Sequence, residues 1–116
     1  LRTRLDADLG GRDLGEVVLA LHPTPAVGGT PREVATSFIS RTEQHERQLY
    51  TGFWGPWNPD GVTDLYVNIR CMHLRNDRAA LFVGAGITAA SDPNSEWNET
   101  EEKGRAWLER IARSNG

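Results

Sequence analysis

Cysteine is almost absent from this 116-residue sequence, which contains Cys71 alone. A single cysteine excludes an internal disulfide, and a chain without disulfides suits a reducing, cytoplasmic compartment. Cys71 lies in a strand-like run, which favours a small buried apolar residue over a reactive thiol. Methionine is equally scarce, since Met72 is the only one and the chain starts at Leu1. With no targeting pattern at that end, we expect a piece of a longer protein rather than a processed chain.

Long apolar runs and basic blocks are also missing. No apolar run approaches the ~20 residues that span a bilayer, so the sequence predicts no membrane segment. The net charge is −3 with both signs scattered, which argues against a nucleic-acid partner. The four tryptophans are therefore predicted to be packing residues rather than a base-stacking platform. The length allows one domain at most, with a modest core.

Several common site templates fail. His22, His45 and His73 lack metal-ligand spacing, which argues against zinc. There is no Walker loop and no nucleophile elbow, and the segment 84–86 (Gly-Ala-Gly) lacks the third glycine and the helix of a dinucleotide fingerprint.

The N-terminal part of the sequence predicts helices. Residues 1–6 alternate weakly, as an edge strand would. An apolar helix should open at Asp13 or Gly15 and reach His22. A second helix is predicted from a capping box, in which Thr30 is the N-cap and Glu33 lies three residues on. Its apolar stripe runs to about residue 46.

The middle of the sequence predicts strands at 49–54, 62–71 and 79–87. The turn chemistry of residues 56–61 and of Asn76-Asp77 separates them. These strands should form an antiparallel meander with helices packed on it, so the predicted fold class is α+β.

The most informative segment is the predicted helix 96–111. Glu96, Glu99 and Lys103 fall at i, i+3 and i+7 on one face, beside an apolar stripe that should be buried. Two carboxylates and an ammonium, after a glycine pair that lets a ligand approach the backbone, suit a site for Mg²⁺ and an anion. The alternative is a purely local role, in which the glutamates favour the positive end of the helix dipole and Glu99 pairs with Lys103.

Two further features could bind an anion. The loop 21–31 combines prolines and glycines with a helix start that leaves free N–H groups, and His22 lies in it. A histidine in a structural hydrogen-bonding niche is the alternative. Arg70 is predicted in mid-strand, on the face opposite Leu65, Val67 and Ile69. It either faces solvent or grips a carboxylate with its planar fork.

Read in order, these motifs resemble the C-terminal part of the chorismate-utilising enzymes, which include isochorismate, anthranilate, aminodeoxychorismate and salicylate synthases. The resemblance covers essentially all of residues 1–116. The sequences of the first two motifs are most similar to those of isochorismate synthases of menaquinone or siderophore biosynthesis. The motifs are Leu21-His22-Pro23-Thr24-Pro25-Ala26-Val27, Ile69-Arg70-Cys71, Phe82-Val83-Gly84-Ala85-Gly86-Ile87 and Glu96-Trp97-Asn98-Glu99 with Lys103.

The resemblance implies a Mg²⁺ cofactor and the dianion chorismate as substrate. Glu99 would coordinate the metal directly, with Glu96 beside it directly or through water. Arg70 would grip the carboxylate of the pyruvyl ether, and Lys103 would provide a further carboxylate contact. His22 would be a site histidine, taken here as catalytic.

The remaining implied substrate contacts are of two kinds. The backbone of Gly84, Ala85 and Gly86 would bind carboxylate oxygens. The side chains of Ala26, Tyr50 and Phe82 would shape the pocket for the ring.

The resemblance also implies that residues essential to catalysis lie outside this chain. In the family, a lysine general base, a glutamate general acid and another Mg²⁺-binding glutamate precede the part that is present, and residues 1–21 contain none of them. We therefore expect the chain to be a C-terminal segment, inactive alone, with apolar surface exposed where an N-terminal part packs. The alternatives are a salicylate, anthranilate or aminodeoxychorismate synthase, and a non-catalytic anion-binding module.

Overall fold

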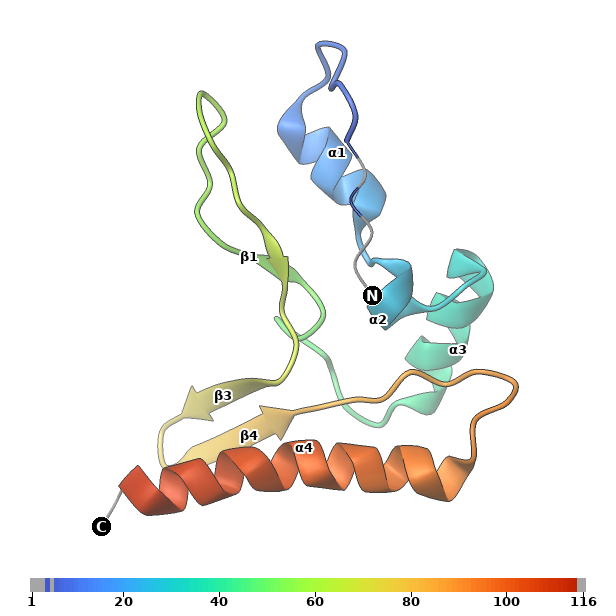
Figure 1. Ribbon diagram of the computed structural model, residues 1–116, viewed down its shortest axis with the longest axis vertical. Helices are drawn as coiled ribbons and strands as arrows, with labels where there is room; N and C mark the ends of the chain where they lie inside the picture. Colours follow the sequence, from blue (N-terminus) through green and yellow to red (C-terminus); the bar gives the residue numbers. More distant parts are fainter. Residues whose placement is uncertain (1–3, 5, 115–116) are drawn as a thin grey trace.

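The computed structural model describes residue 4 and residues 6–114. Over this part of the chain, short helices come first, then two pairs of short strands, then one long helix (Figure 1). The elements are α1 (Leu14–Leu21), α2 (Pro25–Gly28), α3 (Arg32–Thr42), β1 (Phe53–Trp54), β2 (Tyr66–Val67), β3 (Cys71–Arg75), β4 (Arg78–Phe82) and α4 (Pro93–Ser114). The predicted edge strand at 1–6 falls largely outside the described residues. The α+β class is confirmed.

The first helix begins where the sequence predicts. Asp13 is its N-cap, and the Asp13 carboxylate accepts a hydrogen bond from the Glu16 backbone N–H at 3.2 Å. The predicted loop after it is partly wrong, because Pro25 starts the one-turn helix α2. A proline is tolerated there, since the first helical N–H has no partner within the helix.

The predicted capping box of the next helix is also wrong. Pro31 rather than Thr30 is the N-cap of α3, with extended backbone at ψ 144° and no side-chain capping bond. Because the backbone of Pro31 is extended, the first helical residue is Arg32. The helix then ends at Thr42, shorter than the sequence predicts.

The predicted three-stranded meander is wrong as well. β1 and β2 form one antiparallel pair and β3 and β4 another, as two separate sheets. The predicted strand 62–71 is interrupted at Arg70, which has a left-handed backbone at φ 49°. A residue in that conformation cannot continue a strand, so β2 ends before it and β3 begins after it. The predicted turn at Asn76-Asp77 is confirmed, since it joins β3 to β4.

The part of the chain that the structure describes has no apolar core of its own. No apolar residue in the described ranges is buried, so the predicted modest core is wrong. The stripe of α4 that should be buried is open to solvent, with Trp97 66% exposed and Leu108 61% exposed. The other two stripe side chains, Trp107 and Ile111, are each 38% exposed.

The dimensions give the same result. The accessible surface is 10070 Å², whereas a compact monomer of this mass exposes about 6300 Å². The radius of gyration is 17.0 Å, against about 13 Å for a compact domain of this length. Figure 1 shows why: α1 to α3 and the β1–β2 pair extend as two separate arms from a base formed by the β3–β4 hairpin and α4. Within the part that the structure describes, no helix has both the length and the apolar character needed to cross a bilayer.

Candidate functional site

A cavity of about 480 Å³ lies where α2, the loop after α3, the bend at Arg70 and the segment after β4 meet the middle of α4. We call it the main cavity. It brings together most of the substrate-binding residues that the sequence predicts. These are Ala26, Tyr50, Arg70, Gly84, Ala85, Gly86 and Lys103.

Lys103 joins α4 to the chain that follows β4. Its ammonium donates a hydrogen bond to the Gly84 carbonyl at 2.8 Å and pairs with the Glu99 carboxylate one helical turn away. The Lys103 side chain is only 18% exposed, so this cation is held at the wall of the cavity. The local pairing that the sequence offered as the alternative for Glu99 is therefore present.

Gly84 must be small because Tyr50 lies against it. A Cβ atom at Gly84 would lie 2.5 Å from the Tyr50 hydroxyl oxygen, well inside van der Waals contact. Tyr50 in turn stacks on Phe82, with ring centroids 5.6 Å apart and planes 29° apart. Burial raises the pKa of the Tyr50 phenol, while the nearby Arg47 cation opposes that rise. Phe82 thus packs against the Tyr50 ring and does not line the main cavity.

Arg70 lines the cavity from a bend, not from the middle of a strand as the sequence predicts. Its left-handed backbone, at φ 49°, costs conformational energy in a non-glycine residue. The bend turns the chain between β2 and β3 at the point where the Arg70 side chain meets the main cavity.

The structure separates His22 from the main cavity. The imidazole lies edge-on to Phe53, with ring centroids 5.6 Å apart. His22 lines a second cavity of about 500 Å³, and its carbonyl accepts a hydrogen bond from the Arg32 guanidinium. The two cavities share a wall that includes Glu43, Arg47 and Tyr50.

The two predicted metal ligands lie on the first turns of α4. Glu96 is half-buried and the Glu99 side chain is 53% exposed. Neither lines the main cavity, but the ion pair with Lys103 holds the Glu99 carboxylate at its edge. No group of three His, Cys, Asp or Glu side chains in the described residues could hold a metal ion. Two carboxylates alone still fit Mg²⁺, which takes oxygen ligands and keeps several waters.

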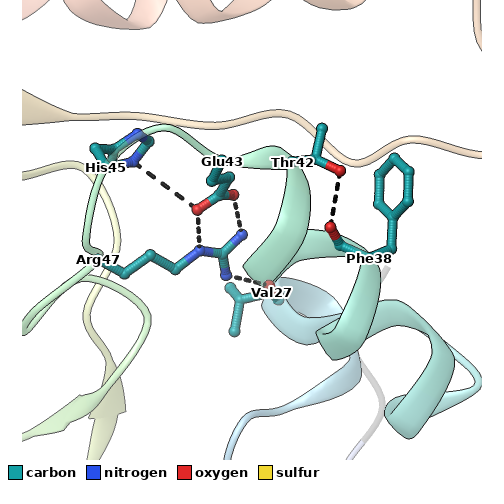
Figure 2. A network of polar contacts seen from close by, with 6 residues as sticks. All are labelled: Val27, Phe38, Thr42, Glu43, His45 and Arg47. Carbon is teal, nitrogen blue, oxygen red and sulfur yellow. Dashed lines mark hydrogen bonds and ion pairs between the residues drawn. The ribbon is translucent and has the colours of Figure 1, made fainter.

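A polar network that the sequence analysis did not single out forms the wall between the two cavities (Figure 2). Arg47 donates two hydrogen bonds to the Glu43 carboxylate, one of them at 2.8 Å from Nε, and a third to the Val27 carbonyl at 2.9 Å. We call Glu43, Arg47 and the Val27 carbonyl the clamp. His45 Nε2 lies 3.9 Å from the Glu43 carboxylate, and the Arg47 guanidinium lies 5.9 Å from the Tyr50 ring centroid.

The clamp ties α2 to the segment that carries Tyr50. The Arg47 hydrogen bonds lower the pKa of the Glu43 carboxyl, and burial opposes them. The same bonds raise the pKa of Arg47. The i, i+4 spacing of Glu43 and Arg47 is a sequence signal that could have indicated this pair.

Comparison with known proteins places the chain in a family. The profile of the chorismate binding enzymes matches residues 1–109. The chain therefore belongs to the chorismate binding enzyme family.

Curated relatives with isochorismate synthase names match the chain. It is 45% identical over 83 residues to the isochorismate synthase EntC of Escherichia coli (strain K12), covering 72% of this chain and 21% of the relative. It is 38% identical over 116 residues to the salicylate biosynthesis isochorismate synthase of Pseudomonas aeruginosa, covering 100% of this chain and 24% of the relative.

An anthranilate synthase matches too. The chain is 35% identical over 91 residues to anthranilate synthase component 1 of Neisseria gonorrhoeae, covering 78% of this chain and 18% of the relative. The chain thus spans about a fifth to a quarter of the length of these relatives. No solved structure matches the chain.

Proposed function

We propose that this chain supplies the carboxylate-binding part of an isochorismate synthase, an isomerase that converts chorismate to isochorismate. The observation that carries the proposal is the main cavity, where Arg70, Lys103 and the 84–86 backbone converge from distant parts of the chain. Chorismate is a dianion, and such a cavity offers an arginine fork, an ammonium and bare backbone to its carboxylates. A cytoplasmic location and a role in menaquinone or siderophore biosynthesis are part of the proposal.

The ring of the substrate would lie against Ala26 and Tyr50. Phe82 holds the Tyr50 ring from behind, and the clamp holds the loop that carries it. Fixing both the ring and the carboxylates orients C2 of the substrate, and orientation is a large part of what an enzyme can contribute to such a reaction.

Glu96 and Glu99 would hold Mg²⁺ at the edge of the main cavity. The bound metal would supply a fixed positive charge for the ring carboxylate of chorismate. Lys103, which holds Glu99 in place, adds a second cation on the same side. The charges of Arg70 and Lys103 offset those of the two glutamates.

The reaction adds water at C2 and releases the C4 hydroxyl group, so atoms and charge balance if one group takes a proton from water and another gives one to the leaving oxygen. Among the described residues, the only carboxylate that lines the main cavity, Glu43, is engaged by Arg47. We propose that the base and the acid come from a further segment, corresponding to the part of the relatives that this chain does not match.

A chimera tests the proposal. In it, the whole of this chain replaces the matching segment of the P. aeruginosa relative, which matches all 116 residues, and chorismate is incubated with Mg²⁺ and the chimera before chromatography. Isochorismate is the expected product. Formation of salicylate, or of anthranilate in the presence of ammonia, would instead assign the chain to another activity of the same family. The match to an anthranilate synthase makes this second outcome worth testing. No product from a folded chimera would contradict catalysis and favour a non-catalytic anion-binding module.

The clamp gives a prediction about stability in the same chimera. Arg47 lowers the pKa of folded Glu43 below its ordinary value of 4.5, so the ionised carboxylate stabilises the folded state above about pH 4.5. That contribution is lost as the pH falls through the lowered pKa. Glu43→Gln is expected to reduce the free energy of unfolding by about 1 kcal/mol at pH 7, and by progressively less below pH 4.5.

Urea unfolding of the chimera at several pH values measures this difference. The control is Glu109→Gln, because Glu109 pairs only with the exposed Arg113 at 3.7 Å and should change stability little. A Glu43→Gln effect that does not depend on pH would contradict an electrostatic role for the clamp.

A further inference from the structure

A third, smaller concavity shares Arg70 and Lys103 with the main cavity. It has a volume of about 270 Å³ and is lined by Arg70, Lys103, Ala106, Trp107 and Arg110. We call it the Arg110 site. Three of its five lining residues are cations, and no described acidic residue lines it. This concentration of positive charge is unexpected in a chain whose net charge is −3.

The cations of the Arg110 site have spare hydrogen-bonding capacity. Among the described residues, neither Arg70 nor Arg110 makes a side-chain hydrogen bond or an ion pair. Local pairing along α4 is not open to Arg110 either, because the residues three and four positions away are Ala106, Trp107, Arg113 and Ser114. Lys103 has three N–H donors, of which the Gly84 carbonyl and Glu99 take two.

The remaining lining is apolar and includes an aromatic ring. Trp107 is 38% exposed, so part of the indole is available to a ligand. A flat ring packs well against an indole, whereas an inorganic anion would leave Trp107 and Ala106 unused. The volume is small for a drug-sized ligand and suits a single ring.

We propose that the Arg110 site binds a planar aromatic carboxylic acid, with the carboxylate between Arg110 and Arg70 and the ring against Trp107. The guanidinium fork of Arg110 matches a carboxylate bidentately. Because Arg70 and Lys103 also line the main cavity, an anion in the Arg110 site draws on the same cations as an anion in the main cavity. Binding at the two places is therefore negatively coupled, and equally so in both directions.

The test uses benzoate as the probe, measured by calorimetry on the folded chimera, with the Trp107 indole N–H followed by NMR. Saturable binding with a shift of that signal is expected. Arg110→Gln and Trp107→Ala should each weaken binding about tenfold or more, as expected for loss of a charge-assisted fork or a stacking surface. The matched control is Arg105→Gln, which removes the same charge from an exposed position on the same helix that does not line the site.

Further probes separate the ring from the charge. Acetate and inorganic phosphate should bind at least about tenfold more weakly than benzoate, because they cannot use Trp107. Binding of either as tightly as benzoate would overturn the assignment of an aromatic acid. Benzoate binding that Arg70→Gln weakens and Arg110→Gln does not would place the acid in the main cavity alone and would also overturn it.

The absence of saturable benzoate binding to the folded chimera would end the proposal outright. None of these readouts needs turnover, so they are independent of the isochorismate assay. The proposed function could fail while the Arg110 site stands, and the converse is equally possible.

Discussion

The isolated 116-residue chain is expected to show no cooperative thermal transition and to convert no chorismate. The physical reason is the absence of a buried apolar residue in the described ranges, together with 10070 Å² of accessible surface. Burial of apolar surface is the main favourable term in folding, and this chain by itself achieves little of it. A compact domain of the same length would absorb about 80 kcal/mol on unfolding.

Differential scanning calorimetry of the chain and of the chimera measures this difference. We expect a heat-absorption peak for the chimera and a flat trace for the chain, with isochorismate formed only by the chimera. A cooperative peak for the chain alone would contradict this expectation, because it requires a buried apolar core. Isochorismate formed by the chain alone would contradict the proposal that the catalytic base and acid come from elsewhere.

Glu99→Gln in the chimera is expected to lower isochorismate formation by about 100-fold or more at ordinary Mg²⁺ concentrations. Replacing the carboxylate removes a direct metal ligand, and a metal that stabilises developing charge contributes several kcal/mol. Glu102→Gln removes the same charge from an exposed position on α4 and should change the rate little. The measurement is the initial rate as a function of Mg²⁺ concentration.

The Mg²⁺ dependence separates two roles of Glu99. If Glu99 acts as a ligand, the variant should need much more Mg²⁺ for its residual rate. If Glu99 acts only by holding Lys103, the rate should fall with no change in the Mg²⁺ requirement. Equal losses from Glu99→Gln and Glu102→Gln would show that the two-carboxylate face of α4 is not a metal site.

Three local signals in this sequence predicted local structure correctly. Asp13 starts α1 as its capping chemistry requires, and Asn76-Asp77 turns the β3–β4 hairpin. The 3.6-residue pattern of residues 96–111 predicted α4, although the helix extends further at both ends, from Pro93 to Ser114. Each of these features depends on interactions between residues that are close in the sequence, so the sequence alone is enough to predict it.

Features that depend on distant residues were predicted less well. The alternation of residues 62–71 indicated one strand, but the left-handed backbone of Arg70 divides it. Side-chain pattern carries little information about such a bend, because arginine rarely adopts that conformation. The stripe on α4 predicted burial, yet a pattern cannot say whether the covering partner is within the chain. In this chain, Trp97 on that stripe is 66% exposed.

The candidate site shows the same division. Sequence reasoning named Lys103 and the 84–86 backbone, and the structure brings them into one cavity with Arg70 and Tyr50. His22 lies in the neighbouring cavity instead. The clamp was missed because its third bond joins Arg47 to the carbonyl of Val27, twenty residues earlier, and no side-chain pattern records a backbone acceptor.

The two strand pairs carry a final consequence. Each described sheet has only two strands, so every strand leaves one row of backbone N–H and C=O groups without a neighbouring strand. Two-stranded sheets are marginal alone in water, and such rows are templates for another strand. A complementary segment that added strands there would be selected by hydrogen-bond register as well as by apolar cover. Until such a segment binds, the same rows expose the chain to pairing with copies of itself.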